Sequence, residues 1–222
     1  NEQFHNAMEA HNKIGSVGKP LPSTEVKVAK DGELLVKGDH IMKGYYNNPE
    51  ATSKEIIDNW FHTGDVGEID NNGFVSITGR KKEIYVSSAG KNIAPLVIEE
   101  TMKSIPLVSQ CFLVGDNKNY CTALITLDVG VILRDKFSMD SNKIPKDPGE
   151  QLKVLISKGK KLDDFTSSEE IFGEIEIKIN ELNNEFSNPE QIKKFTILPR
   201  DFTIDDGELT PTLKIRRKQI LE

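Results

Sequence analysis

The strongest constraint on the fold is the segment TGDVGEIDNNGFVSITGRKKEIYVSSAG, residues 63–90. Asn72-Gly73 lies between two strand-like runs and favours a tight turn, because both residues tolerate positive φ. The segment therefore predicts an antiparallel hairpin. Asp65 stands in its first strand, and Arg80 follows fifteen positions later at the end of its second. A carboxylate and a guanidinium on either side of a hinge-like segment suit a nucleotide held between two moving parts.

The residues before Gly79 have the pattern of antiparallel strands. Short apolar runs broken by Gly, Pro and Asp predict one strand around Val26–Val28 and another within residues 32–38. A short helix is predicted from Pro49 to about Asp58, since proline is favoured at an early helical position. This part of the chain therefore predicts an almost entirely antiparallel β structure.

After Arg80 the pattern alternates between strands and helices. Strands are predicted at EIYVS, SQCFLVGD, YCTALITLD and KKFTILP, and a helix at PLVIEETMKSI. Ser167-Ser168-Glu169-Glu170 predicts the start of the longest helix. Its apolar stripe consists of Ile171, Ile175, Ile179, Leu182 and Phe186. Residues 129–166 give no clear assignment beyond a short helix at GEQLKVLISKG.

The predicted fold class is α+β, with two parts. Residues 1–79 are expected to form an antiparallel β subdomain, and residues 80–222 a small α+β domain with a central sheet and flanking helices. The length of 222 residues and a hydrophobic content of 36% are enough for one or two domains with real cores. Residues 1–13 are polar and without a clear period, which fits either a short helix or a tail.

Composition and spacing exclude several classes of function. The formal net charge of −6 argues against a nucleic-acid partner, because phosphate binding uses clustered Lys and Arg. Cys111 and Cys121 lack zinc-site spacing and stand in apolar runs, which predicts buried free thiols. The four histidines have no metal-ligand spacing, so no metal site is predicted. Phosphate-loop, dinucleotide, zinc-protease and nucleophile-elbow motifs are absent.

Three residues remain as candidates for nucleotide chemistry, each with a plainer alternative. Asp65 can accept two hydrogen bonds from a ribose diol, or it can stabilise a turn. Arg80 can reach the same ribose or a phosphate with its planar fork, or it can be an ordinary surface arginine. Lys214 follows Thr-Pro-Thr-Leu near the C-terminus, where a lysine is usually solvated. Their order and spacing carry more information than any one of them.

In that order and spacing the chain resembles the adenylate-forming superfamily of acyl-CoA synthetases, peptide-synthetase adenylation domains and luciferases. The segments that carry the resemblance are GELLVKGDHIMKGYYNNPEAT, WFHTGDVGEIDNNGFVSITGRKKEI and SSAGKNIAPLVIEE, and it covers nearly all of residues 14–222. Within the superfamily the sequence is most similar to long-chain fatty-acyl-CoA synthetases of the bubblegum and related bacterial types. That likeness rests on ITGRKKE, on FTILPRDFT and on the terminal LTPTLK.

The resemblance implies a role for five residues. Asp65 would bind the ribose hydroxyls of the nucleotide with help from Arg80, and Lys82 would occupy the hinge. Gly90 would lie on the loop that lines the pantetheine tunnel of CoA. Lys214 would be the adenylation lysine between the fatty carboxylate and the α-phosphate. The implied reaction joins a fatty acid to ATP as acyl-AMP, with Mg²⁺, and then transfers the acyl group to CoA.

The resemblance also implies that this sequence is the C-terminal portion of a larger enzyme. The family's ATP phosphate loop and fatty-acid pocket are not found in it, and Mg²⁺ would be bound mainly by the missing N-terminal part. Residues 1–79 would end the large domain, residues 80–222 would be the mobile cap, and the chain alone would be inactive. Two alternatives stay open, a ligase for another carboxylic acid and a catalytically incomplete binding module. Either the cytoplasm or a peripheral position on a membrane fits the sequence.

Overall fold

The computed structural model describes residue 13, residues 15–212 and residues 214–221. The short helix or tail expected for residues 1–13 therefore lies outside the described residues except at its last position.

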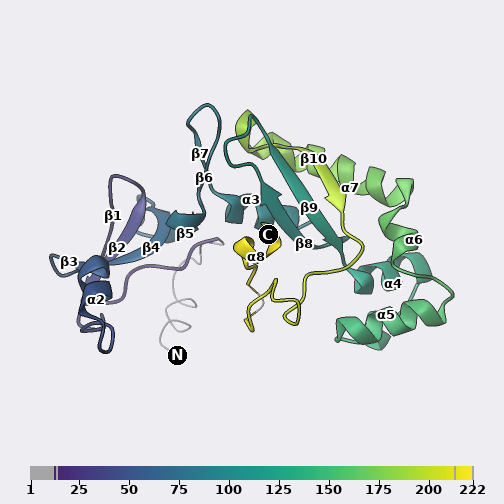
Figure 1. Cartoon of the computed structure of the whole chain (residues 1–222), viewed down its shortest axis with the longest axis horizontal. Helices are drawn as coiled ribbons and strands as arrows, with labels where there is room; N and C mark the ends of the chain where they lie inside the picture. Colours follow the sequence, from purple (N-terminus) through teal and green to yellow (C-terminus); the bar gives the residue numbers. More distant parts are fainter. Residues whose placement is uncertain (1–12, 14, 213, 222) are drawn as a thin grey trace. The chain divides into compact units, whose positions relative to one another are not determined.

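The chain forms two compact units, the first ending at Ile84 and the second beginning at Tyr85 (Figure 1). Each unit has its own sheet. The expected domain boundary between residues 79 and 80 stays a prediction, because a compact unit does not show which parts of a protein move.

The first unit contains a five-stranded antiparallel sheet. Its strands are β1 (Thr24–Val28), β2 (Glu33–Gly38), β3 (Ile56–Ile57), β4 (Trp60–Ile69) and β5 (Val75–Arg80). The spatial order is β1-β2-β4-β3, and β5 also pairs with β4. The antiparallel structure predicted for this part of the chain is confirmed.

The β4–β5 hairpin closes at the predicted Asn72-Gly73 turn. Gly73 has a φ of 82°, which glycine adopts at little steric cost. The carboxylate of Asp70 accepts a hydrogen bond from the backbone N–H of Asn72 at 2.9 Å and so stabilises the turn. A register shift between Val66 and Gly67 then places Asp65 directly opposite Arg80 on the two strands.

Helix α2 (Pro49–Glu55) begins at the predicted proline and is capped by the side chain of Asn48. The expectation that it continues to about Asp58 is wrong. The β-branched pair Ile56–Ile57 instead forms strand β3 and pairs with the start of β4. Asp58 and Asn59 both have positive φ, 51° and 63°, so they form the tight turn that lets the chain reverse after β3.

The second unit contains a three-stranded sheet and a separate two-stranded ribbon. The ribbon consists of β6 (Tyr85–Val86) and β7 (Asn92–Ile93). The sheet has the order β10-β9-β8, formed by β8 (Val108–Val114), β9 (Cys121–Leu127) and β10 (Ile192–Ile197). Strands β8 and β9 are antiparallel, whereas β10 runs parallel to β9. This sheet with its helices matches the small α+β domain expected from the sequence.

Two helices of the second unit begin at the start signals found in the sequence. Helix α3 (Pro95–Met102) begins at its proline, and α7 (Glu169–Leu182) begins after Ser168, whose Oγ accepts a hydrogen bond from the backbone of Ile171. The expected stripe of α7 is wrong at Phe186. The α-helix ends at Leu182 and a 3₁₀ turn follows it. Phe186, just after that turn, lies in extended chain.

Residues 129–166 form short helical segments, and most of them are capped by an aspartate. Asp128 and Asp147 stand at helix starts and accept hydrogen bonds from backbone N–H groups two to three residues into the helix. The helical elements of this unit beyond α3 and α7 are α4 (Val129–Phe137), η2 (Ser141–Lys143), α5 (Pro148–Ser157), α6 (Asp163–Thr166), η3 (Asn183–Glu185), η4 (Asn188–Glu190) and α8 (Arg217–Leu221). Helix α5 confirms the short helix predicted at GEQLKVLISKG, whereas mixed composition hid α4 and α6 in the sequence.

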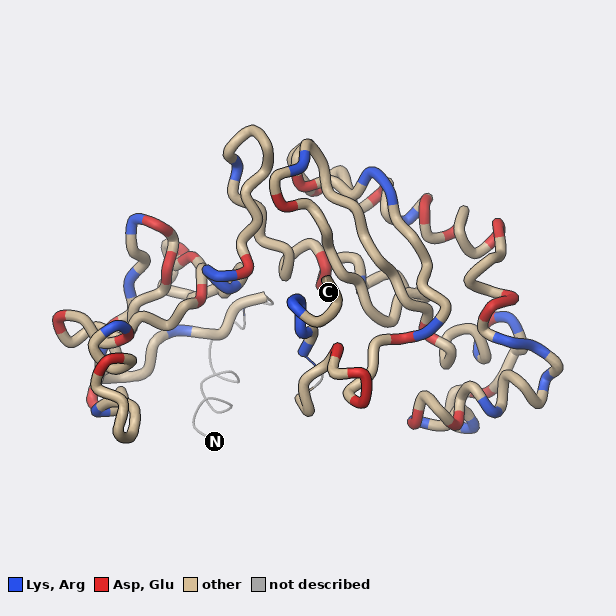
Figure 2. The backbone as a smooth tube through the Cα atoms, in the orientation of Figure 1, with Lys and Arg blue, Asp and Glu red and all other residues tan. Residues whose placement is uncertain are grey.

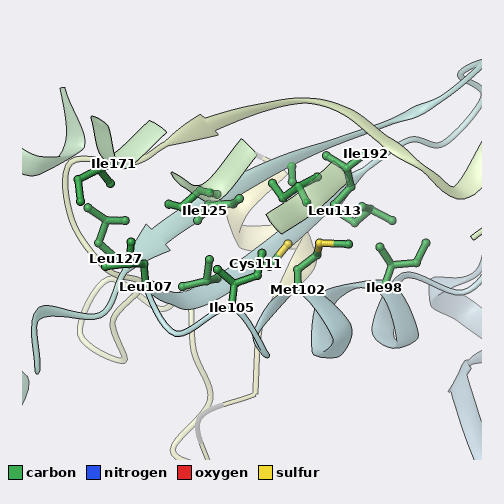
Figure 3. Close-up of a cluster of buried hydrophobic side chains, with 14 of the residues drawn as sticks. Ile98, Met102, Ile105, Leu107, Cys111, Leu113, Ile125, Leu127, Ile171 and Ile192 are labelled. Carbon is green, nitrogen blue, oxygen red and sulfur yellow. The ribbon is translucent and has the colours of Figure 1, made fainter. Parts of the chain in front are cut away.

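The sheet of the second unit has an apolar layer on each face. Residues of α3, α7, β8 and β9 meet in the larger layer (Figure 3), which includes Ile98, Met102, Leu113, Ile125 and Ile171. Phe112 alternates with its neighbours and belongs to the smaller layer with Phe202 and Leu209. Part of the C-terminal segment therefore packs on the second face, which the sequence had not indicated.

Charged residues are distributed over both units (Figure 2), and the predicted buried free thiols are confirmed. Lys and Arg are interspersed with Asp and Glu along both units (Figure 2). Cys111 and Cys121 are free and buried; burial raises the pKa of Cys111 well above its ordinary range and that of Cys121 to about 11. Within the described ranges, none of the helices has both the length and the hydropathy that a bilayer crossing requires.

Candidate functional site

Asp65 and Arg80 form an ion pair across the β4–β5 hairpin. Arg80 Nε lies 3.0 Å from Asp65 Oδ1, and Arg80 Nη1 donates a hydrogen bond to the carbonyl oxygen of Thr63 at 3.2 Å. The side chain of Asp65 is 23% exposed and that of Arg80 is 53% exposed. Both groups stand in strands rather than in a turn, and both remain accessible to a ligand.

The backbone around Asp65 is held by a buried carboxylate that sequence reasoning missed. Glu33 Oε1 accepts a hydrogen bond from the backbone N–H of Gly64 at 2.9 Å, and Gly64 has a φ of 70°. Thr63 Oγ1 donates to the carbonyl oxygen of Leu34 at 2.7 Å and accepts from the N–H of Asp65 at 3.0 Å. The Thr-Gly-Asp segment is thus fixed to strand β2 from two sides.

The electrostatic environment of Glu33 explains why a buried carboxylate is tolerated there. Its side chain is 5% exposed and contacts Lys81 Nζ at 2.9 Å and His62 Nδ1 at 3.0 Å. Burial by itself would raise the pKa of Glu33, but hydrogen bonds from Lys81, His62 and Gly64 outweigh it and hold the pKa below its ordinary value. The sequence feature that could have pointed to a buried Glu33 is a single acidic residue at the start of the apolar run GELLV.

Lys81 connects the turn after β5 to the same cluster. Its Nζ lies 2.6 Å from Asp31 Oδ2 as well as 2.9 Å from Glu33, and hydrogen bonds to these two carboxylates raise its pKa. Lys82 is the exposed middle residue of the 3₁₀ turn η1 (Lys81–Glu83). The residue before the expected hinge is therefore fixed to the first unit, while Lys82 itself is exposed.

Gly90 lies in the loop between β6 and β7. Its φ is 80°, and a Cβ placed there would meet nothing within 4 Å, so the backbone conformation rather than crowding requires glycine. The loop is held at its base, where Ser88 N–H donates to the carbonyl of Lys118 at 3.0 Å. On its other side, Lys91 Nζ lies 2.8 Å from Glu190 Oε2 and also contacts Ser187. An exposed glycine thus sits at the tip of a fixed loop.

Lys214 stands on a narrow turn near the C-terminus. Leu209 and Ile215 form an isolated antiparallel bridge, Lys214 N–H donates to Thr210 Oγ1 at 3.0 Å, and Thr210 N–H donates to the carbonyl of Lys214 at 2.8 Å. Leu209 and Ile215 belong to the apolar layer around Phe112, whereas Lys214 is exposed. The turn therefore presents an ammonium group from a packed base.

The structure brings together only part of the expected set. Asp65 and Arg80 pair directly, and Lys82 follows them in the first unit. Gly90 and Lys214 lie on two separate loops of the second unit. Among the described residues, no group of three or more His, Cys, Asp and Glu side chains is arranged to hold a metal ion.

Known proteins resemble this chain in part of its sequence and in its fold. The family model described as AMP-binding enzyme C-terminal domain matches residues 82–141. The fold resembles O-succinylbenzoate coenzyme A synthetase from Bacillus subtilis, solved with ATP and magnesium ion, with a TM-score of 0.60 and 24% identity over 95% of this chain and 36% of that one. It also resembles the adenylation domain of a carboxylate reductase from Mycobacterium chelonae, with a TM-score of 0.64 and 18% identity over 91% of this chain and 29% of that one.

Two relatives are more similar in sequence. The chain is 42% identical over 210 residues to the long-chain-fatty-acid–CoA ligase FadD15 of Mycobacterium tuberculosis, covering 95% of this chain and 32% of that protein. It is 33% identical over 220 residues to the long-chain-fatty-acid–CoA ligase ACSBG1 of Rattus norvegicus, covering 95% and 30% respectively. The chain is similar to these ligases over nearly its whole length and spans about a third of the length of each.

Proposed function

We propose that this chain is the C-terminal portion of an ATP-dependent long-chain fatty acid–CoA ligase. The observation that supports this most is the 42% identity with a ligase of that name over 95% of the chain. This chain has an Asp–Arg pair and a lysine on a packed turn, which suit the two charges that such a reaction handles. The N-terminal portion of the enzyme would supply the fatty-acid pocket and the rest of the ATP site.

Asp65 and Arg80 are proposed to hold the nucleotide sugar. Arg80 contacts one carboxylate oxygen of Asp65, Oδ1, and restricts the carboxylate to one orientation. A charged acceptor held in this way suits the two hydroxyl donors of a ribose. The hydrogen bonds that Gly64 N–H donates to Glu33 and Asp65 N–H donates to Thr63 keep the backbone leading into Asp65 from shifting when the sugar binds.

Lys214 is proposed to act in acyl-AMP formation. In that step a carboxylate oxygen of the fatty acid forms a bond to the α-phosphorus, and the bond from that phosphorus to pyrophosphate breaks. The attack brings negative charges together, and a positioned ammonium stabilises the charge that develops. Lys214 is exposed on a turn with a packed base, which suits a group that must enter a site formed by another part of the enzyme.

Gly90 is proposed to line the path of the CoA pantetheine in the second step. The CoA sulfur then forms a bond to the acyl carbon, the bond from that carbon to the oxygen of AMP breaks, and the thiol proton passes to solvent. Gly90 leaves open space at the tip of its loop. Because Lys214 and Gly90 lie on different loops, we propose that the second unit turns about Lys82 between the two steps and that both orientations have similar free energies.

The substrates proposed for the complete enzyme are a fatty acid, ATP and CoA. The Bacillus subtilis neighbour was solved with magnesium ion beside ATP, but no cluster among the described residues of this chain suits a metal ion, so we assign Mg²⁺ no residue here. We place the enzyme in the cytoplasm or at the periphery of a membrane, where fatty acids partition.

The decisive experiment changes Lys214 in the complete enzyme and measures the two half-reactions separately. Lys214→Ala should lower pyrophosphate release from ATP and fatty acid by about 10²–10³-fold, while thioester formation from supplied acyl-AMP and CoA changes little. Lys178→Ala, at an exposed ion pair on α7, is the matched control and should leave both rates unchanged. Equal losses in the two half-reactions would remove Lys214 from this role, and no activity with any fatty acid would overturn the proposed function.

A further inference from the structure

A buried ion pair lies just after the lysine-bearing turn. Arg217 is three residues beyond Lys214 and begins helix α8. Its Nη2 contacts Glu99 Oε2 on helix α3, and the two side chains are 12% and 5% exposed. Charges withdrawn from water in this way are costly unless further hydrogen bonds compensate them.

The further hydrogen bonds all converge on strand β8. Glu99 Oε1 accepts a hydrogen bond from the backbone N–H of Leu113 at 2.6 Å, and Tyr85 Oη donates to the carbonyl of Leu113 at 2.7 Å. Strand β8 is at the edge of its sheet, so these two side chains satisfy backbone groups that no neighbouring strand reaches. Arg217 Nη1 donates to Tyr85 Oη at 3.1 Å and closes the network.

The network also has an aromatic component. The guanidinium carbon of Arg217 lies 5.1 Å from the ring centre of Phe112 and 5.7 Å from that of Tyr85, within the range of cation–π attraction. Burial raises the pKa of Tyr85 although the charge of Arg217 opposes this, so the hydroxyl keeps the proton that it donates to Leu113. Arg217 is thereby held by contacts from several directions at once.

The cluster joins segments that are far apart in the sequence. Tyr85 is the first residue of the second unit, Glu99 is in α3, and Arg217 directly follows the lysine turn. Packing alone would not need these charges, because apolar residues of similar volume often serve a core equally well. An ion pair with fixed hydrogen bonds adds a defined orientation of the segments that it joins.

We propose that Glu99, Arg217 and Tyr85 are positioning residues for Lys214, fixing its turn to the start of the second unit so that the lysine reaches the α-phosphate when that unit turns. The inference rests on the proposed function. The lysine side chain is long and flexible, so the position of its backbone decides where the ammonium can go. A displacement of about 1 Å can cost about 10²-fold in rate.

The experiment removes the ion pair without leaving a buried charge unpaired. In the complete enzyme, Glu99→Gln together with Arg217→Met should lower pyrophosphate release by about 10–100-fold. Thioester formation from supplied acyl-AMP and CoA should stay within about threefold, because that step does not use Lys214. Glu100→Gln is the matched control, since Glu100 is the next residue on α3 and pairs with Lys103 at the surface; it should change neither rate.

A second variant keeps the test decisive if the double variant does not fold. Tyr85→Phe removes one acceptor of Arg217 but keeps the ring and the Glu99 contact. It should lower pyrophosphate release several-fold and spare the thioester step. Equal losses in both steps, or an unchanged first step, would overturn the positioning role and leave only a structural one.

The failure of this inference can be told apart from the failure of the proposed function. If Lys214→Ala itself leaves pyrophosphate release intact, the proposed role of Lys214 is wrong. The positioning role of residues 85, 99 and 217 then fails with it. If Lys214→Ala abolishes the first step while the variants at Glu99, Arg217 and Tyr85 do not impair it, only the positioning role is wrong.

Discussion

The two units of this chain are stabilised by different kinds of interaction. In the first unit the buried apolar residues among those described are Leu34, Leu35 and Val75. The carboxylate of Glu33 is also buried there and contacts Lys81 and the backbone of Gly64. The second unit has apolar layers on both faces of its sheet. Charges and backbone pairing therefore matter most in the first unit, and close packing matters most in the second.

The largest effect should come from a cavity in the second unit. Leu133 in α4 is fully buried, so Leu133→Ala should lower the free energy of unfolding by about 2–5 kcal/mol. Denaturant titration of the chain, followed by circular dichroism, measures this. Ile177→Ala on α7, where the side chain is 60% exposed, should stay within about 0.5 kcal/mol of the unchanged chain. Similar losses for both would mean that burial does not distinguish them.

A smaller effect is expected when the central charge of the first unit is removed. Glu33→Gln keeps the shape but loses the charged acceptor for Lys81 and Gly64, which should cost about 1–3 kcal/mol. The matched control is Glu25→Gln, because Glu25 forms an exposed pair with Lys37 and such pairs contribute about 0–1 kcal/mol. If the two variants unfold at the same denaturant concentration, the cluster around Glu33 does not stabilise this unit.

The contribution of Glu33 should also depend on pH. Its pKa in the folded chain lies below the ordinary value of 4.5, so its stabilising effect is present above that pH and is lost as the pH falls through the lower folded-state value. The difference in thermal midpoint between the unchanged chain and Glu33→Gln should therefore be constant near neutral pH and narrow below pH 4.5. A difference that persists unchanged to about pH 3 would contradict the lowered pKa.

The smallest signal should come from the thiols of the second unit. Burial raises the pKa of Cys121 to about 11, and Cys111 is fully buried, so neither should react measurably with iodoacetamide at neutral pH in the folded chain. Mass spectrometry of the labelled chain measures this. Leu133→Ala should speed labelling by making local opening more frequent, whereas Ile177→Ala should not. Rapid labelling of the unchanged chain would show that the core is less closed than its packing indicates.

Local signals in the sequence were sufficient for several elements. Asn72-Gly73 predicted the hairpin, Pro95 predicted the start of α3, and Ser168 predicted the start of α7; all three are confirmed. These features depend on backbone preferences of a few neighbouring residues. The predicted ends of α2 and of the α7 stripe were wrong, because strand pairing at Ile56–Ile57 and a 3₁₀ turn after Leu182 overrode the local pattern.

The candidate site shows the same division between features set by neighbouring residues and features set by tertiary contacts. The hairpin itself was within reach of the sequence, although the pairing of Asp65 with Arg80 also needs a register shift between Val66 and Gly67 that the turn does not set. The contacts of Glu33 with Lys81 and of Glu99 with Arg217 were not, since each joins residues 48 or 118 positions apart. No local pattern specifies such pairs, and each glutamate looked like an ordinary charged residue of its strand or helix.

The sequence by itself determined the resemblance to adenylate-forming enzymes and the starts of several elements, because the order of its motifs and the preferences of its turn and cap residues are properties of the chain alone. Only the tertiary structure decided what holds those motifs in place. A buried carboxylate is stable only where hydrogen-bond donors surround it. Which donors reach it depends on the residues that folding brings together. Glu33, which accepts a hydrogen bond from Gly64, and Glu99, which pairs with Arg217, are two carboxylates whose partners only the folded structure reveals.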